Sequence, residues 1–288
     1  MKTTRLVLLS ALLATLAITS TVEAQKVKLG DNAALRYWSA FSQMQDVSIT
    51  NDDAKQLTST IDGTIPYSDS RYKDLVEKNK SALDTMARGT ALPNCDWGLE
   101  YQLGTETPVE YVRKALTLGR LNVLYALHLI ASGDKDGAVR VLTVGLQFSR
   151  DVANDGTVFA TVAAKSLLTV HLRAIDVVAR EGKLSVKQRA SLQQAVAKLG
   201  RDGLDWQSAI RRELSGLHGP ASPVSPDIER LIPDYVEAVS NLSMLPRLRQ
   251  SITNMPPQFQ EMIPNPKRVL EEKEELANQL QRTLALLQ

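Results

Sequence analysis

The chain has 288 residues, a net charge of +2 and a single cysteine, Cys95. Nucleic-acid binding draws most of its non-specific affinity from a basic surface, so this nearly neutral balance argues against a DNA or RNA partner. One cysteine excludes an intramolecular disulfide, so packing alone has to stabilise the fold.

The first 24 residues have the pattern of a secretory signal peptide. Lys2 and Arg5 precede a largely apolar run at residues 6–18, and residues 22–24 end in the small-residue pattern of a signal peptidase site. We therefore expect cleavage after Ala24 and export to the periplasm or the extracellular medium. No later stretch has the ~18 consecutive apolar residues that a spanning helix requires, so we expect no transmembrane segment in the mature chain.

The mature chain is dominated by helix patterns, and strand patterns are almost absent. The first helix is predicted to be capped by Asp31 and Asn32 and to bury residues at three- and four-residue spacings. These residues are Ala34, Tyr37, Trp38, Phe41 and Met44. A polar stretch follows. The next helix is predicted to begin at Ser68 or Asp69 and to end at Gly89 in a left-handed conformation.

The clearest capping pattern is Thr107-Pro108-Val109-Glu110, which predicts a helix over residues 107–132. Gly133 and Asp134 then close that helix and cap another, and such a short connection makes the two helices antiparallel neighbours. Ser185 and Gln188 form a second capping box. The remaining helices are predicted over residues 135–154, 156–181, 185–199 and 204–217.

The composition changes after Gly219, because nine of the twelve prolines follow it. We expect a turn-rich linker at residues 220–226, short helices interrupted by Pro233 and Pro246, and extended chain over residues 255–266. Residues 267–288 return to helix and are expected to pack on the body. One face of this helix carries Leu276, Leu280, Leu284 and Leu287. This leucine stripe is the candidate partner-binding surface, and a homo-oligomer through it is the alternative use.

These patterns predict an all-α fold built from antiparallel helical hairpins, either TPR-like or an irregular bundle. The chain then divides into a signal peptide at residues 1–24, a helical-hairpin domain at 25–219 and a proline-rich C-terminal segment at 220–288. Residues 119–152 resemble one tetratricopeptide repeat. Ala126, Ala138 and Gly145 stand where that family has small residues, and Gly133 stands in its tight turn. The family's aromatic and proline positions are not matched, and residues 153–186 do not repeat the unit.

Two further segments look like stretches of uncharacterised exported helical proteins of bacteria. They are residues 31–41 and the sequence Cys-Asp-Trp-Gly at residues 95–98. The resemblance implies an all-helical fold and an exported location, and it implies no particular activity.

The residues that usually carry metal or hydrolytic chemistry are few. His128, His171 and His218 are the three histidines, and none has a metal-ligand or catalytic spacing. There is no G-x-S-x-G sequence, no phosphate-binding glycine loop and no paired-cysteine motif. We therefore predict neither a metal nor a cofactor.

The densest group of reactive and aromatic residues lies in the long loop before the predicted 107–132 helix. Cys95, Asp96, Trp97, Glu100 and Tyr101 are candidate residues for binding a sugar or peptide, with Asp96 and Glu100 as the only candidates for an acid and a base. The alternative is that Trp97 and Tyr101 fill the core while Asp96 caps a turn.

The function that these patterns favour is a non-enzymatic binding or scaffold protein of the cell envelope that presents a helical groove to a peptide or protein. One alternative is a hydrolase-like enzyme of unknown class that uses Asp96 and Glu100 as acid and base. The other is a structural envelope protein that self-associates through residues 267–288.

Overall fold

The computed structural model describes residues 29–45, 51–101, 109–217 and 225–288. The chain divides into two units, residues 1–31 and residues 32–288. In the first unit only the short 3-10 helix η1 (Leu29–Asp31) is described, so the predicted signal peptide lies outside the described residues. In the described residues of the second unit every regular element is a helix, which confirms the all-α prediction.

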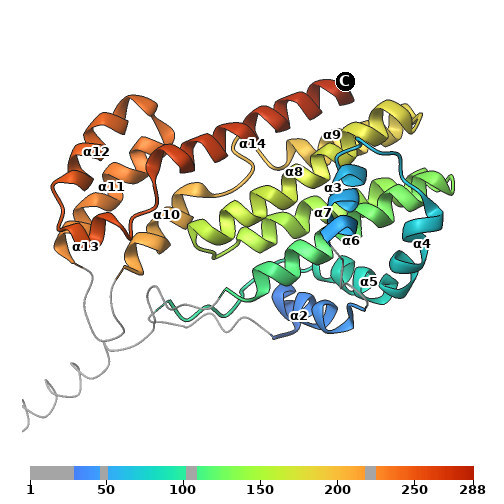
Figure 1. The fold of residues 1–288 in the computed structure, drawn as a ribbon, viewed down its shortest axis with the longest axis horizontal. Coiled ribbons are helices and arrows are strands. Elements are labelled where there is room, and N and C mark those ends of the chain that lie inside the picture. Colours follow the sequence, from blue (N-terminus) through green and yellow to red (C-terminus); the bar gives the residue numbers. More distant parts are fainter. Residues whose placement is uncertain (1–28, 46–50, 102–108, 218–224) are drawn as a thin grey trace, which may run out of the picture. The chain divides into compact units, whose positions relative to one another are not determined.

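Most helices of the second unit follow one another with short connections, and a longer one follows residue 89 (Figure 1). In chain order they are α2 (Ala33–Gln43), α3 (Asn51–Ile61), α4 (Asp69–Lys78), α5 (Lys80–Gly89), α6 (Tyr111–Ala131), α7 (Lys135–Ala153), α8 (Val158–Glu181), α9 (Val186–Ala197), α10 (Trp206–Ser215), α11 (Pro226–Ser240), η3 (Leu242–Met244), α12 (Leu245–Thr253), α13 (Pro257–Gln260) and α14 (Pro266–Leu287).

Helices α6, α7 and α8 pack on one another at the centre of this unit. The turn between α6 and α7 is the predicted one, with Gly133 at a φ of 88° and the Asp134 side chain accepting a hydrogen bond from the Gly137 N–H. Such a tight turn makes the two helices an antiparallel hairpin, as the sequence predicted. The closer likeness to a tetratricopeptide repeat stays a prediction.

Small and polar residues allow the three central helices to approach closely. A Cβ atom at Gly145 of α7 would lie 2.2 Å from the His171 ring of α8 and 2.6 Å from the Asn122 amide of α6. His171 is fully buried, and its Nδ1 lies 2.8 Å from the Leu167 carbonyl oxygen while Asn122 lies 3.2 Å from its Nε2. Burial lowers the pKa of His171 to about 4, so the ring is neutral at pH 7.

Helix α8 is the one described helix long and apolar enough to cross a membrane by length and composition. Of the apolar stretch that meets this criterion, 56% is buried, and α8 packs against α6, α7 and α14. A helix at the centre of a folded domain passes the same composition test, because other helices cover most of its apolar side chains.

Helix α14 runs from the group of α11, α12 and α13 along α8 and α9 (Figure 1). Leu276, Leu280 and Leu287 are buried in the main core. Gly203 lets α14 approach, because a Cβ atom there would lie 2.8 Å from Leu276. Helix α14 therefore packs on the other helices of this unit.

Two helices differ from the prediction before residue 101. The expected single helix from Asp69 to Gly89 is broken at Asn79. The buried Asn79 side-chain amide causes the break, because it forms hydrogen bonds with the backbone N–H and carbonyl oxygen of Gln45 and with the carbonyl oxygen of Leu75. Gly89 is the last residue of α5 but is not left-handed, so that expectation was wrong. Its lack of a side chain serves packing, since a Cβ atom would lie 2.6 Å from the Tyr37 ring. The polar stretch contains an unpredicted helix, α3, which buries Leu57 and Ile61.

The helix predicted from residue 107 begins later. Val109 is not helical and Glu110 occupies the N-cap position of α6 without a side-chain cap bond, while Thr107 and Pro108 lie outside the described residues. A turn closed by the Val112 N–H and the Val109 carbonyl oxygen, 3.1 Å apart, precedes the helix.

Prolines begin helices in the C-terminal segment more often than they interrupt them. Pro226, Pro246, Pro257 and Pro266 each lie at the first or second helical position, where the missing N–H costs nothing. Pro233 lies inside α11 without ending it, so the predicted interruption there was wrong. The helix continues because both sides of the proline carry buried residues, including Leu231 and Tyr235. Residues 255–266 also include a short helix, α13, so they are not wholly extended.

Candidate functional site

The segment that holds the five predicted ligand-binding residues lies along the first turn of α2. The Ala33 N–H donates to the Asn94 carbonyl oxygen at 2.7 Å. The Asn32 side chain donates to the Asp96 carbonyl oxygen at 2.8 Å and accepts from the Asp96 N–H at 2.9 Å. This backbone pairing fixes which of the following side chains point inward.

Trp97 points inward and is 6% exposed. Its ring stacks on Tyr111 with the centroids 4.0 Å apart, and it also stacks on Tyr37 and Phe41. The indole Nε1–H donates to the Asp151 carbonyl oxygen at 2.7 Å, in the last turn of α7. Trp97 therefore covers the end of α7 and is part of the core, as in the alternative that the sequence left open, and it is not a ligand contact in this structure.

Cys95 lies beside the same carbonyl group, with its Sγ 3.5 Å from the Asp151 oxygen. Burial, together with the nearby Asp151 carboxyl, raises the pKa of the thiol well above its ordinary value. The thiol is therefore protonated at neutral pH and unsuited to nucleophilic chemistry.

The Asp151 carboxyl, which lies beside Cys95, has a strongly shifted pKa. It accepts hydrogen bonds from Tyr37 and, at 2.8 Å, from Gln147. Burial raises its pKa to about 6, although both hydrogen bonds act in the opposite direction. Burial and the neighbouring Asp151 raise the pKa of Tyr37 above its ordinary value. Asp151 and Tyr37 are 8% and 0% exposed, so this pair stabilises the core and offers no opening for a substrate.

Asp96 and Glu100, the predicted acid and base, are both exposed. The Asp96 Oδ1 accepts a hydrogen bond from the Gly98 N–H at 2.8 Å, where Gly98 has a φ of 65°. Asp96 therefore caps a turn, and neither carboxylate lines any of the hollows formed by α7, α8, α9 and α14. Tyr101 is half-buried, and burial raises its pKa to about 12.

The leucine stripe of α14 is mostly used inside the chain. Leu276, Leu280 and Leu287 are 0%, 1% and 2% exposed, so their prediction as partner-binding residues is wrong for this folded state. Polar bonds on the same helix add to the docking, since Gln279 and Thr283 both donate to the buried Asp176 carboxylate at 2.9 and 2.7 Å. Leu284 is half-buried and lines a shallow hollow.

A groove between α7 and α9 has the properties that a binding surface requires, and we name it the α7–α9 groove. It has a volume of about 610 Å³. Its apolar floor is formed by Val139, Val144, Leu146, Ala195 and Leu199. Its rim carries neutral polar side chains, among them Thr143, Gln147 and Gln194.

Every charged residue that lines the α7–α9 groove is basic. Arg140, Arg150 and Lys198 are all exposed, and none forms an ion pair with another described residue. No aspartate or glutamate of the described chain is among the lining residues. Arg150 does lower the pKa of Asp151, whose carboxylate is turned into the core. The groove is therefore both apolar at its base and electropositive at its edge.

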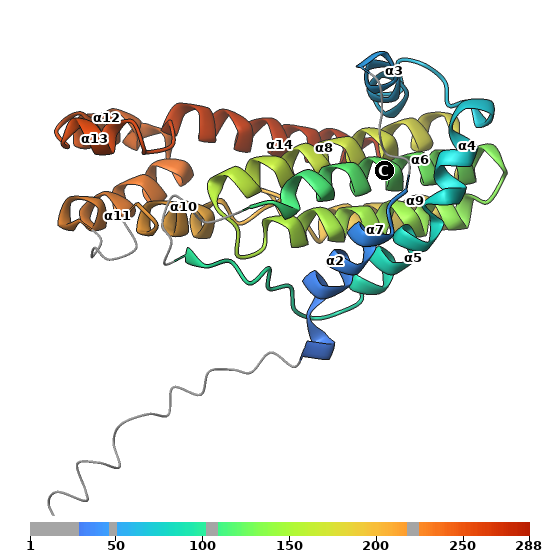
Figure 2. The ribbon, with the colours of Figure 1, turned by 60° about the horizontal axis from the view of Figure 1, so that its bottom comes forward.

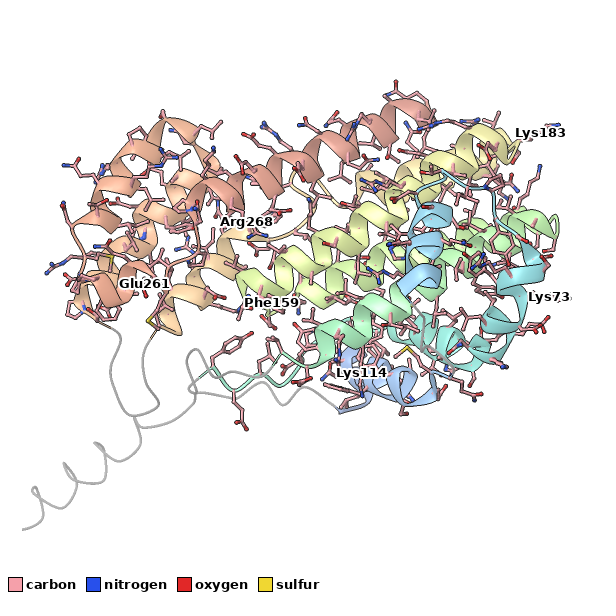
Figure 3. All side chains as sticks on the ribbon, in the orientation of Figure 1. Lys73, Lys114, Phe159, Lys183, Glu261 and Arg268 are labelled. Carbon is pink, nitrogen blue, oxygen red and sulfur yellow. The ribbon has the colours of Figure 1, made fainter. Side chains whose placement is uncertain are left out.

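The two helices that form the groove run in the same direction. Near their starts, the Gln188 side chain donates to Asp136 at 2.7 Å, and Lys135 Nζ donates to the carbonyl oxygen of Lys183 at 3.0 Å. Lys183 lies in the turn between α8 and α9 (Figure 3). Arg140 consequently lies toward the start of the groove, whereas Arg150 and Lys198 lie toward its end.

A second hollow, of about 410 Å³, lies on the other side of α9, between α9 and α14. Gln194 lines both hollows, and the second one is lined by small, neutral polar and apolar residues without any charged side chain. Helix α9 thus has a hollow along each side. The sequence did not identify these residues, because solvent-facing polar positions recur on every helix and only the packing of α9 beside α7 makes a groove of them.

No group of three or more histidine, cysteine, aspartate or glutamate side chains in the described ranges is arranged to hold a metal ion. His128 has one partner, Asp69, at 2.7 Å, and His218 lies outside the described residues.

Comparisons with known proteins gave no match: no family model, no curated protein and no solved structure is significantly similar to this chain.

Proposed function

We propose that this chain is a non-enzymatic binding or scaffold protein that uses the α7–α9 groove to hold a segment of a peptide or protein partner. The observation that carries the proposal is the combination of an apolar floor with three basic residues that have no ion-pair partner among the described residues. Protein surfaces that bind partners combine desolvated apolar contacts with a polar or charged rim. Two other hollows, both along α8 and α14, are lined mainly by polar and charged side chains.

Export to the cell envelope belongs to the same proposal. It is supported by the signal-peptide pattern of residues 1–24 and by a folded unit that contains one, buried, cysteine. A partner of the cell envelope is the expectation that follows.

The enzyme alternative has less support, because Asp96 is engaged in capping the turn at Gly98 and both Asp96 and Glu100 are open to solvent. Self-association through α14 also has less support, because its leucines are occupied within the chain. No specific observation favours either alternative.

The proposal can be tested by site-specific photo-crosslinking in cells that naturally produce the protein. A benzophenone amino acid replaces Gln194, which lies in the groove, and the matched control replaces Gln250, an exposed glutamine of α12. We expect a discrete crosslinked adduct from position 194 and none from position 250.

A blocking variant makes the test specific to the groove. Thr143→Trp fills the groove from its rim, and Thr253→Trp is its control, because both threonines are exposed and both donate to the carbonyl oxygen four residues earlier. Thr143→Trp should abolish the adduct while Thr253→Trp leaves it unchanged. An adduct that survives Thr143→Trp would contradict the proposal.

A further inference from the structure

We infer that the partner segment held by the α7–α9 groove is an acidic amphipathic helix. This inference rests on the proposed function and specifies the chemistry of its ligand. It follows from the sign of the charges, the apolar floor and the spacing of the basic residues.

Two surfaces of the same protein differ in how their basic side chains are accompanied by acidic ones. Along α8 and α14, acidic side chains lie among the basic ones: Lys165 lies 2.6 Å from both Glu272 and Glu275, and Arg173 lies 2.7 Å from Asp62. Along α7 and α9, no carboxylate of the described chain lines the groove beside Arg140, Arg150 and Lys198, and none of these three residues forms an ion pair there. A ligand that supplies carboxylates here would meet complementary charge, whereas a basic ligand would be repelled.

The floor of the groove adds a requirement for apolar groups. Val139, Leu146 and Leu199 are at most 9% exposed and are flanked by the half-buried Val144 and Ala195. A ligand with charge alone would leave the exposed parts of Val144 and Ala195 in water. A ligand with apolar side chains on one face would cover it, and burial of apolar surface is the main favourable term in such contacts.

The spacing of the basic residues fits a helical ligand. Arg140 and Arg150 are ten residues apart on one helix, which places them roughly 15 Å apart along its axis at about 1.5 Å per residue. Lys198 lies at the same end as Arg150, because α7 and α9 run in the same direction (Figure 2). A second helix laid in the groove would meet this pattern with acidic residues about three turns apart on one edge. An amphipathic helix in an apolar groove is a common mode of peptide recognition.

The test uses the full folded protein and three labelled helical peptides of the same length. The first has leucines on one face and glutamates three turns apart along its edge, the second has glutamine in place of glutamate, and the third has lysine. Fluorescence anisotropy gives each Kd at low and at moderate salt. We expect the acidic peptide to bind at least about tenfold more tightly than the glutamine peptide, and more weakly as salt rises.

Charge-reversal variants assign the effect to the groove. The triple variant Arg140→Glu, Arg150→Glu and Lys198→Glu should weaken the acidic peptide at least about tenfold and should favour the lysine peptide. The control Arg113→Glu, Arg211→Glu and Arg249→Glu changes the net charge equally at exposed helical sites outside the groove. It should leave the acidic peptide's Kd unchanged.

Three outcomes would overturn the inference: equal binding of the acidic and glutamine peptides, equal weakening by the two triple variants, or binding to phosphatidylglycerol vesicles that depends on the three groove cations while no peptide binds. If the inference fails but Thr143→Trp still abolishes the adduct at position 194, the proposed function survives with a ligand of different chemistry. If that adduct is absent, the proposed function fails as well.

Discussion

Trp97 fixes the end of α7 through one side-chain hydrogen bond and a set of ring contacts. Its indole N–H reaches a carbonyl oxygen that lies 54 residues away in the sequence. The same Asp151 carbonyl oxygen also accepts a hydrogen bond from the Cys95 thiol. The carboxyl group of Asp151 accepts one from the Tyr37 hydroxyl. Cys95, Trp97 and Asp151 are residue types that often occur in reactive sites. Here their buried contacts connect α2, α7 and the loop that carries Cys95 and Trp97.

The first prediction concerns the indole hydrogen bond. Trp97→Phe keeps an aromatic ring but removes the donor and some volume, so we expect the free energy of unfolding to fall by about 1–3 kcal/mol. Urea denaturation measures it. Trp38→Phe is the matched control, because Trp38 is 38% exposed and its loss should cost less than about 1 kcal/mol. Equal losses in the two variants would show that the bond to Asp151 adds little.

The second prediction concerns the contact of the three central helices at Gly145. In an open helix, replacing glycine by alanine stabilises by ~1 kcal/mol because alanine is the better helix former. At Gly145 the added methyl group would overlap the buried His171 ring, so we expect Gly145→Ala to destabilise by about 1–3 kcal/mol. The sign of the change in thermal and urea stability decides the matter, and a gain in stability would refute the close packing.

At the scale of the element, α14 is a core helix of this fold. It supplies three buried leucines, a buried amide–carboxylate network with Asp176 and two ion pairs with Lys165. Deleting residues 267–288 would therefore expose the core, so such a truncation tests folding before it tests partner binding.

The third prediction separates the two roles that leucines have on this helix. Leu276→Ala removes a fully buried side chain and should lower the free energy of unfolding by about 2–5 kcal/mol. Leu284→Ala changes a half-buried residue of the same type on the same helix and should cost less than about 1.5 kcal/mol. Chemical denaturation of both variants provides the comparison. Similar costs would mean that α14 is not docked as described.

At the scale of the whole molecule, two buried groups give stability opposite dependences on pH. The pKa of His171 is lowered to about 4 from 6.5, so between these values the unfolded chain binds more protons and acidification destabilises the fold. The pKa of Asp151 is raised to about 6 from 3.8, so between those values the folded chain binds more protons and acidification stabilises it.

The fourth prediction is that substitution separates these two contributions. In His171→Gln the loss of stability on acidification from about pH 6.5 to 4 should be reduced relative to the unchanged protein. In Asp151→Asn that loss should become steeper, because the opposing contribution is gone. Each group changes the slope by at most about 1.4 kcal/mol per pH unit. Urea denaturation across this pH range measures the slopes, and changes of the same sign in both variants would contradict the assignment.

The helices and several of their boundaries were predictable from the sequence because their causes are local. The Asp134 cap and the Ser185–Gln188 capping box each involve residues three apart, and both are present in the structure. The break at Asn79 was not predictable, because it depends on a hydrogen bond to Gln45, 34 residues away. Pro233 was misjudged for a similar reason, since buried neighbours from other helices stabilise α11 around it.

The candidate site was less predictable than the fold. The sequence identified Cys95, Asp96, Trp97, Glu100 and Tyr101 by their chemistry, but burial and exposure separate them: Cys95 and Trp97 are in the core, and Asp96 and Glu100 face solvent. The basic residues of the α7–α9 groove looked like ordinary surface charges, because nothing in their local sequence reports the neighbouring helix.

The sequence by itself determined that this chain folds as capped, amphipathic helices joined by short turns, since spacing and capping act within a few residues. Only the tertiary structure decided which faces are buried and which remain open. Trp97 and Asp151, or Gln279 and Asp176, are separated by 54 and 103 residues and meet only when the helices have packed. The α7–α9 groove arises in the same way, because two helices that are not consecutive in the chain lie side by side and leave an apolar, basic surface between them.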